Sequence, residues 1–231
     1  LKNLEKKGFI KTNLDPKTLV NFRKFKSEVK KHCSAMLKSN NFSFENFHKT
    51  PVEDIKLNNL RLSLIKSFST DNSLNETVYF SLKKLIDACV GPDIIVQKSC
   101  NLVIQRPNDF NRSPFHKDAP ANSNYEIVIW LPLVDCVGTM SMYMFEVKNH
   151  ERAKAFLRKQ NSEKEIDKFC KKYGKLLNYK FGEVLIFWTN NYHYIPVNKE
   201  KKTRWSLNLR FKNLFTPYGT KNLLDYYQIL K

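Results

Sequence analysis

The chain has no long hydrophobic run. None of its apolar stretches approaches the roughly 18 consecutive residues that a membrane-spanning helix needs, so a transmembrane protein is excluded. The opening residues, LKNLEKKGFI, are charged and do not contain the apolar segment of a secretory signal peptide. We therefore expect a cytoplasmic protein with no membrane span.

Cysteine is scarce, and its positions form no recognisable motif. The five cysteines are an odd number, and no two of them are spaced as C-x-x-C. This pattern argues against a disulfide framework and against a zinc ribbon, and it predicts reduced thiols. The cysteines are Cys33, Cys89, Cys100, Cys136 and Cys170.

Acidic residues are outnumbered by basic ones. The sequence has 22 Asp and Glu against 40 Lys and Arg, which gives a formal charge of +18 and raises the question of a nucleic-acid partner. Of the basic residues, however, 32 are Lys and only eight are Arg, and the lysines are scattered. No run reaches the roughly five or six like charges that mark a basic tail. This distribution favours a solvated lysine surface, and we do not expect a nucleic-acid partner.

Apolar and aromatic side chains are plentiful. Hydrophobic residues make up 42% of the chain and aromatic residues 13%, enough to bury a sizeable core. Global disorder and collagen-like or coiled-coil architectures are therefore excluded. The length of 231 residues favours a single domain that spans positions 1–231.

The first part of this domain, residues 1–92, has a helical pattern. Apolar residues recur near a 3.6-residue period over positions 17–39, after Asp15-Pro16, which is a typical N-cap followed by a first-turn proline. Positions 73–90 repeat the pattern up to Gly91-Pro92. We expect these helices to support the rest of the domain.

The pattern changes after Pro92. Short runs rich in Val, Ile, Tyr, Phe and Trp alternate with turn residues, which is typical of β-strands. A Lys/Glu-rich helical stretch at 147–177 interrupts them, and positions 216–231 end in a short helix candidate. Helices followed by many short strands predict a mainly β protein with helices (α+β), a sandwich or jelly roll whose core spans 93–215. The expected strands are 93–97, 102–106, 127–133, 140–147, 183–188 and 205–211.

Three motifs among these strands carry functional groups. The segment from Ser113 to Asp118 contains an H-x-D, a glycine-started strand leads to His193, and Arg204-Trp-Ser206 begins an alternating strand. Residues i and i+2 of extended backbone point to the same side, so one H-x-D can supply two metal ligands. Two imidazoles and one carboxylate form the facial triad of non-haem Fe(II) oxygenases. A bound 2-oxo acid would also need a cation for its far carboxylate, and the fork of an arginine suits that role.

An H-x-D alone is a weak signal, but the ordered combination of the three motifs is much more specific. In that order the sequence resembles the Fe(II)/2-oxoglutarate-dependent dioxygenases, within the phytanoyl-CoA dioxygenase-like branch. The resemblance covers residues 95–215 and implies a double-stranded β-helix, the jelly roll of this family. It departs from the usual pattern at Gly182-Glu183, where relatives often have Gly-Asp, and at 147–150, where many have a Pro-Gly-Ser-His-like turn.

The resemblance also implies roles for individual residues. The iron ligands, which are the catalytic residues, would be His116, Asp118 and His193. The residues in contact with 2-oxoglutarate would be Arg204, Ser206 and Thr139. The cofactors implied are Fe(II), 2-oxoglutarate as co-substrate and O2, with succinate, CO2 and a hydroxylated product as the outcome.

Arginine is rare in this chain, and several arginines lie near the motifs. Arg106 and Arg112 flank the H-x-D, and Arg210 shares a strand face with Arg204. We expect these residues, with Gln105, to bind a small substrate that carries a carboxylate or phosphate. Candidate substrates are an amino acid, a sugar, or a precursor of a natural product or surface glycan.

Two alternatives remain open from the sequence. One is an oxygenase that acts on a macromolecule, either nucleic acid or protein, which would require basic and aromatic side chains around the iron pocket. The other is a jelly-roll binding protein without redox turnover. The presence of three ligands and an arginine favours the enzyme that acts on a small molecule.

Overall fold

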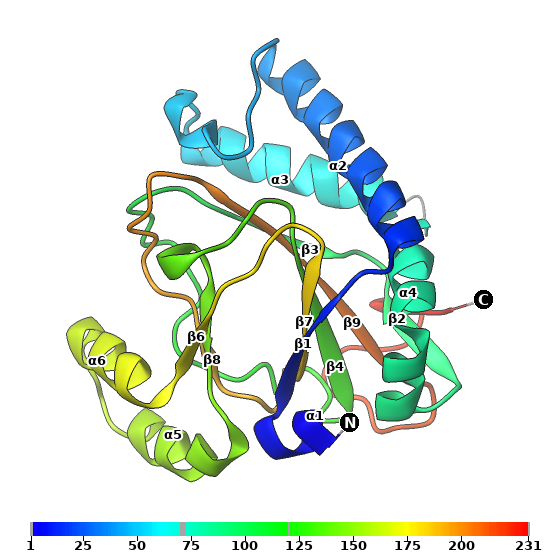
Figure 1. Ribbon diagram of the computed structural model, residues 1–231, viewed down its shortest axis with the longest axis vertical. Helices are drawn as coiled ribbons and strands as arrows, with labels where there is room; N and C mark the ends of the chain where they lie inside the picture. Colours follow the sequence, from blue (N-terminus) through cyan, green and yellow to red (C-terminus); the bar gives the residue numbers. More distant parts are fainter. Residues whose placement is uncertain (1, 70–72, 120, 231) are drawn as a thin grey trace.

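The computed structural model describes residues 2–69, 73–119 and 121–230, and its centre consists of two antiparallel β-sheets (Figure 1). The larger sheet has the order β1-β7-β4-β9-β2-β10, with β3 also paired to β9, and the smaller sheet has the order β6-β5-β8. The larger sheet comprises β1 (Phe9–Asn13), β2 (Ile94–Gln97), β3 (Asn101–Gln105), β4 (Glu126–Pro132), β7 (Glu183–Trp188), β9 (Arg204–Asn213) and β10 (Tyr227–Ile229). The smaller sheet comprises β5 (Met142–Met144), β6 (Lys175–Leu177) and β8 (His193–Tyr194). This arrangement confirms the predicted jelly roll.

Helices lie on two sides of the sheets (Figure 1). The long N-terminal helices α2, α3 and α4 lie along one side, and α5 and α6 lie on the other side near β6 and β8. The predicted start of α2 is confirmed, since the Asp15 side chain accepts a hydrogen bond from the Thr18 amide and Pro16 opens the helix. The helices are α1 (Lys2–Lys7), α2 (Pro16–Leu37), α3 (Asp54–Ser69), α4 (Ser73–Val90), α5 (His150–Leu157) and α6 (Glu163–Tyr173).

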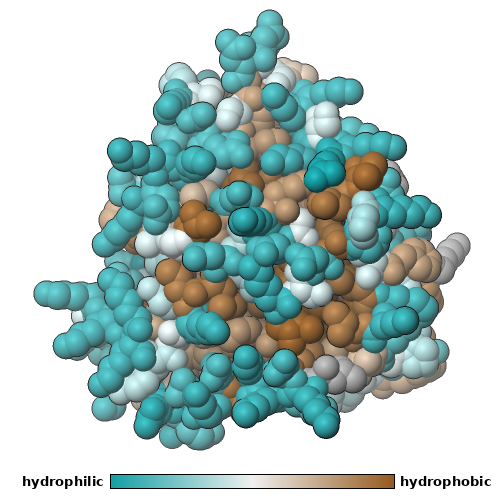
Figure 2. Space-filling view, in the orientation of Figure 1, coloured by the Kyte–Doolittle hydropathy of each residue, from teal (hydrophilic) through white to brown (hydrophobic). Residues whose placement is uncertain are grey.

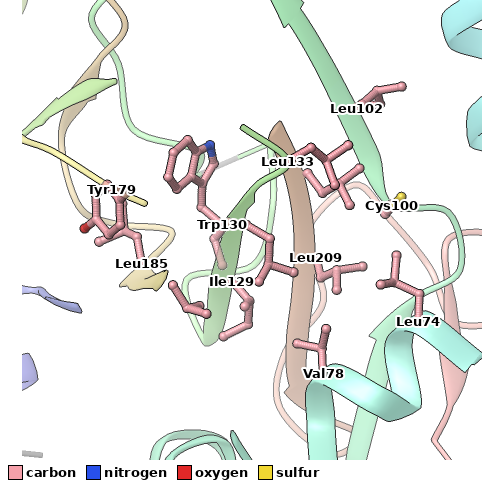
Figure 3. Packing of buried hydrophobic residues seen from close by; sticks show 14 of the residues in the cluster. Leu74, Val78, Cys100, Leu102, Ile129, Trp130, Leu133, Tyr179, Leu185 and Leu209 are labelled. Carbon is pink, nitrogen blue, oxygen red and sulfur yellow. The ribbon is translucent and has the colours of Figure 1, made fainter. Parts of the chain in front are cut away.

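Strand β9 separates the helix-packed core from the polar interior of the roll. Its residues Trp205, Leu207, Leu209 and Phe211 are fully buried in the main hydrophobic core. Figure 3 shows Leu209 directed toward Leu74 and Val78 of α4, while Trp130 and Tyr179 lie on the opposite side of β4. Because side chains alternate along a strand, the polar residues of β9 face the side away from the helices.

The structure corrects the prediction at both ends of the chain. Positions 216–231 contain β10 instead of a helix, and β10 pairs antiparallel with β2. A short apolar run fits either period, and the exposed edge of β2 provides the hydrogen-bond partners that decide between them. Within the region predicted to be helical support, Phe9–Asn13 forms β1 and pairs with β7. The predicted helical insert at 147–177 contains α5 and α6, but its last residues form β6.

The surface agrees with the scattered charge of the sequence. Hydrophilic side chains spread over the face shown in Figure 2, with apolar patches between them. Among the described lysines only Lys212 is buried. No helix within the described ranges combines the length and the apolarity that crossing a bilayer requires.

Candidate metal and co-substrate site

The fold brings together the three residues that the motifs single out. His116 and His193 form an isolated antiparallel bridge, in which the His116 amide donates to the His193 carbonyl at 3.1 Å and the His193 amide donates back at 2.9 Å. Asp118 follows two positions after His116, so its side chain turns to the same side. Ligand atoms of His116, Asp118 and His193 all lie within 4.8 Å of one another.

The two imidazoles present the same nitrogen to Asp118. Nε2 of His116 lies 3.3 Å and Nε2 of His193 lies 3.9 Å from Asp118 Oδ1. Each Nδ1 faces a backbone carbonyl, that of Pro114 at 2.6 Å and that of Asn191 at 3.1 Å. Nδ1–H donation to these carbonyls fixes the tautomer and leaves both Nε2 atoms free to bind a metal.

The surroundings favour the protonation states that metal binding needs. Burial, reinforced by the neighbouring His116, lowers the pKa of His193 to about 4, so this ring is neutral at pH 7. Burial alone would raise the pKa of the Asp118 carboxyl, but contacts with His116, His193 and Arg210 hold it well below its usual range. A neutral imidazole beside an ionised carboxylate is the donor set that a divalent cation requires.

Arg210 lies directly behind the Asp118 carboxylate. Its Nη2 donates to Asp118 Oδ2 at 2.9 Å, and its Nη1 donates to Gln97 Oε1 at 3.2 Å. Its Nε lies 3.2 Å from Oε1 of Glu126, a fully buried carboxyl that also accepts a short hydrogen bond from the Tyr227 hydroxyl. The structure therefore places Arg210, predicted to bind substrate, beside Asp118, where two carboxylates balance its charge; its Nε lies within ion-pair range of Glu126 but forms no hydrogen bond with a described residue.

Arg204 has a contrasting environment. It is 1% exposed, its Nε donates to Ser206 Oγ at 3.2 Å, and its guanidinium lies 5.5 Å from the centroid of the Trp130 ring. Its Nη1 is buried without a hydrogen-bond partner among the described residues, and no carboxylate there pairs with it. Burial lowers its pKa because the charged form loses its water. A buried, unpaired guanidinium of this kind can hold an anionic ligand.

The structure gives the predicted Thr139 different partners. Its hydroxyl donates to Glu200 Oε1 at 2.9 Å and accepts from the Lys199 amide at 2.8 Å. Its backbone amide also donates to Glu200, at 3.0 Å. These bonds tie Thr139 to the loop before β9, and a contact between Thr139 and 2-oxoglutarate stays a prediction.

Gln105, Arg106 and Arg112 lie together beside the triad, where they line one cavity. Gln105 is 2% exposed and is paired across the strands with Arg204. Arg106 reaches the exposed Asp54, and Arg112 pairs with Glu163 of α6. The structure brings the three residues together, but both arginines have acidic partners, and a contact with substrate stays a prediction.

The helical insert packs against the segments that carry His116 and His193. Phe115, next to His116, lies 6.2 Å from Phe156 of α5 and 5.8 Å from Phe169 of α6 between ring centroids. Tyr194, next to His193, donates to Asp167 of α6 at 2.5 Å. The insert therefore packs against both segments that carry the triad histidines.

Sequence reasoning missed Glu126 and Tyr227. Glu126 opens the apolar strand β4, and a carboxyl at the start of a fully buried strand is a signal that could have marked it. Tyr227 was assigned to a helix, and only the pairing of β10 with β2 brings its hydroxyl to Glu126. No local motif could have indicated that contact.

No protein-family model and no curated protein matches this chain. Among solved structures, HygX from Streptomyces hygroscopicus with nickel and 2-oxoglutarate bound superimposes with a TM-score of 0.58 at 10% identity, over 97% of this chain and 89% of that one. The epimerase SnoN in complex with Fe3+, alpha ketoglutarate and nogalamycin RO gives 0.54 at 13% identity, over 94% and 84%. The nickel complex of the non-heme monooxygenase ThoJ gives 0.53 at 12%, over 92% and 76%. The likeness shows a shared fold, in agreement with the resemblance read from the motifs.

Proposed function

We propose that this chain is an Fe(II)- and 2-oxoglutarate-dependent oxygenase. The observation that carries the proposal is the His116–Asp118–His193 cluster, in which two Nε2 atoms and a carboxylate oxygen converge within 4.8 Å. Two imidazoles and one carboxylate leave open positions on an octahedral metal, the ligand set of non-haem Fe(II) oxygenases. HygX and SnoN, which share the fold, carry nickel or Fe3+ together with 2-oxoglutarate.

Arg204 would hold the far carboxylate of 2-oxoglutarate, with Ser206 as its neighbour. The unpartnered Nη1 of Arg204 fits this role, because a buried donor without a partner costs free energy that a carboxylate would recover. When bound, iron and 2-oxoglutarate would supply the oxidising chemistry with O2, of which one oxygen atom would enter succinate as CO2 leaves and the other would enter the substrate.

Other residues of the chain orient the side chains of the triad and shield them from water. The carbonyls of Pro114 and Asn191 keep the imidazole protons on Nδ1, and Arg210 holds the Asp118 carboxylate in place. The insert covers the ligand segments with an aromatic cluster, which limits the access of water.

We further propose that the substrate is a small anionic molecule and that the outcome is hydroxylation. The cavity lined by Arg106, Arg112 and Gln105 supports an anionic substrate, since a third arginine in its wall, Arg61, forms no ion pair with a described residue. Solved structures with this fold include a monooxygenase, an epimerase and a carbocyclase, so the mass of the product distinguishes hydroxylation from an outcome without added oxygen. The five free cysteines suit a cytoplasmic enzyme.

The decisive experiment is 2-oxoglutarate turnover without added substrate. The wild-type protein with Fe(II) in air should form succinate, and His116→Ala and His193→Ala should reduce that rate to the level of free iron. His32→Ala is the matched control, since His32 lies on α2 and its Nε2 contacts Ser63 at 3.0 Å, away from the triad. Succinate formation by His116→Ala at the wild-type rate would refute the proposal.

A further inference from the structure

A cavity with a volume of about 430 Å3 borders the triad segments and lies between α3 and β3. Three of its lining residues connect it to the proposed active site. Gln105 is paired with Arg204 in the sheet, Ser113 precedes His116 by three positions, and Ile195 follows His193 by two. A molecule bound there would lie against both ligand-bearing segments.

Three of the eight arginines of the chain line this cavity, and one differs from the other two. Arg106 contacts Asp54 Oδ1 at 2.5 Å, and Arg112 pairs with Glu163 and donates to the Tyr194 hydroxyl at 2.9 Å. Arg61 of α3 donates only to the neutral Asn58 Oδ1, at 3.0 Å. Among the described residues, no carboxylate forms an ion pair with Arg61, so its charge is available to a ligand.

The remaining polar lining is rich in amides. Gln105 is 2% exposed, and its Oε1 has no hydrogen-bond partner among the described residues. Nε of Arg112, whose side chain is 8% exposed, is likewise without a partner there. Both atoms belong to residues of the same cavity wall, and no described residue uses their hydrogen-bonding capacity. Further amides come from Asn58, Asn101 and Asn111.

We infer that this cavity is the substrate site and takes a compact polyhydroxylated molecule with one anionic group, a phosphate or a carboxylate. Arg61 holds the anionic group, and the amides hold the hydroxyls. Two carboxylates, Asp54 and Asp109, also line the cavity, so its charge favours a single anionic group over several. The volume lies at the lower end of the range for small-molecule sites and limits the ligand to that size.

The inference rests on the proposed function for its catalytic meaning, but its test reads binding alone. Calorimetric titrations would use the full chain with glucose 6-phosphate, glucuronate and glucose as probes. The variants are Arg61→Met and, as a matched control, Lys56→Met, which removes the same charge from an exposed position of α3 outside the cavity. Circular dichroism would check that both variants fold.

We expect the two anionic sugars to bind at least about tenfold more tightly than glucose, the usual scale of a charge-assisted contact. Arg61→Met should remove this advantage and leave glucose binding unchanged, while Lys56→Met should retain it. The inference is overturned if Arg61→Met binds the anionic probes like the wild type, or if glucose binds as tightly as they do. Absence of binding by every probe up to about 10 mM, above the usual KM range, also overturns it.

These outcomes are independent of the iron site. If the protein binds anionic sugars through Arg61 but forms no succinate, the proposed oxygenase activity is refuted and the inferred ligand of the cavity is retained. If the protein forms succinate in a reaction that requires His116 but binds no sugar, the proposed oxygenase activity is retained and the inferred ligand of the cavity is refuted. Preference for glucose 6-phosphate or for glucuronate would identify which anionic group the cavity takes.

Discussion

Strand β9 buries two arginines on the same face, Arg204 at its start and Arg210 further along, and their surroundings differ in charge. Arg210 is surrounded by acceptors, with Asp118, Glu126 and Gln97 all within 3.2 Å of its guanidinium. Arg204 has one hydroxyl at 3.2 Å, an aromatic ring and an unpartnered Nη1. Burial costs both guanidinium groups their hydration, but only Arg210 is compensated within the chain.

This difference separates a structural charge from a binding charge. An arginine with two carboxylate partners contributes to the folded state and holds those carboxylates in position, so its charge is not available to a ligand. An arginine without a carboxylate partner leaves a free-energy cost in the ligand-free protein that an anion can offset. The sequence shows both as arginines six positions apart, and only the surroundings distinguish them.

The largest expected effect comes from removing Arg210, the arginine with two carboxylate partners. Arg210→Met leaves Asp118 and Glu126 buried without their cation, and breaking a buried pair in this way typically costs about 3–5 kcal/mol of unfolding free energy. Urea denaturation would measure the loss. Arg158→Met on the exposed surface after α5 is the matched control and should change stability by less than about 0.5 kcal/mol. Equal stabilities of the two variants would contradict the structural role of Arg210.

The next effect concerns the pH dependence that Glu126 confers. Burial outweighs the Tyr227 hydrogen bond and the Arg210 charge and raises the pKa of the Glu126 carboxyl from 4.5 to about 7. Between these values the folded state holds a proton that the unfolded state has lost, so the contribution of Glu126 to stability is complete below about pH 4.5 and falls as pH rises to 7. The decrease amounts to roughly 3 kcal/mol at most.

Glu126→Gln should remove this dependence. Urea denaturation at several values between pH 4.5 and 8, on the wild type and the variant, would give the difference in unfolding free energy. We expect the wild type to lose stability relative to Glu126→Gln as pH increases across this window. A difference that stays constant with pH would show that Glu126 is ionised throughout.

The third effect belongs to Arg204, the arginine without a carboxylate partner among the described residues. Arg204→Met should weaken 2-oxoglutarate binding by about 100-fold, since charge-assisted contacts are the strongest that a carboxylate makes. The ligand-free variant should be as stable as the wild type within about 1 kcal/mol, because an uncompensated buried charge is removed. Titration with 2-oxoglutarate and urea denaturation measure the two quantities. An unchanged affinity for 2-oxoglutarate, or a stability loss as large as that of Arg210→Met, would show that Arg204 has a structural role like that of Arg210.

The sequence predicted those parts of the site that depend on local spacing. Strand alternation placed Arg204, Ser206 and Arg210 on one face, and the H-x-D placed two ligands on one side, because side-chain direction follows from backbone period alone. The strand Glu183–Trp188 has the predicted boundaries, and the predicted strands at β2, β3 and β4 agree within one residue at each end.

What depends on contacts between distant segments could not be predicted. The partner of Arg210 on β4 follows from sheet register, and Tyr227 reaches Glu126 only because β10 adds to the edge of β2. Arg61 lies on a helix of weak amphipathicity, whose cavity-facing side no pattern in the sequence indicates. Such pairings are set by the global packing and have no local signature.

The smallest effect tests how far the binding region around Arg204 extends. The Thr139 hydroxyl is bonded to Glu200 and to the Lys199 amide, so Thr139→Val should cost about 1 kcal/mol of stability through the loss of those bonds. Because these bonds already use the hydroxyl, the 2-oxoglutarate concentration required for half-maximal succinate formation should change less than about twofold. Ser206→Ala is the matched comparison, since Ser206 contacts Arg204 directly and its loss should raise that concentration. A larger increase of that concentration in Thr139→Val than in Ser206→Ala would mean that the loop before β9 rearranges when 2-oxoglutarate binds. The binding site around Arg204 would then include Thr139.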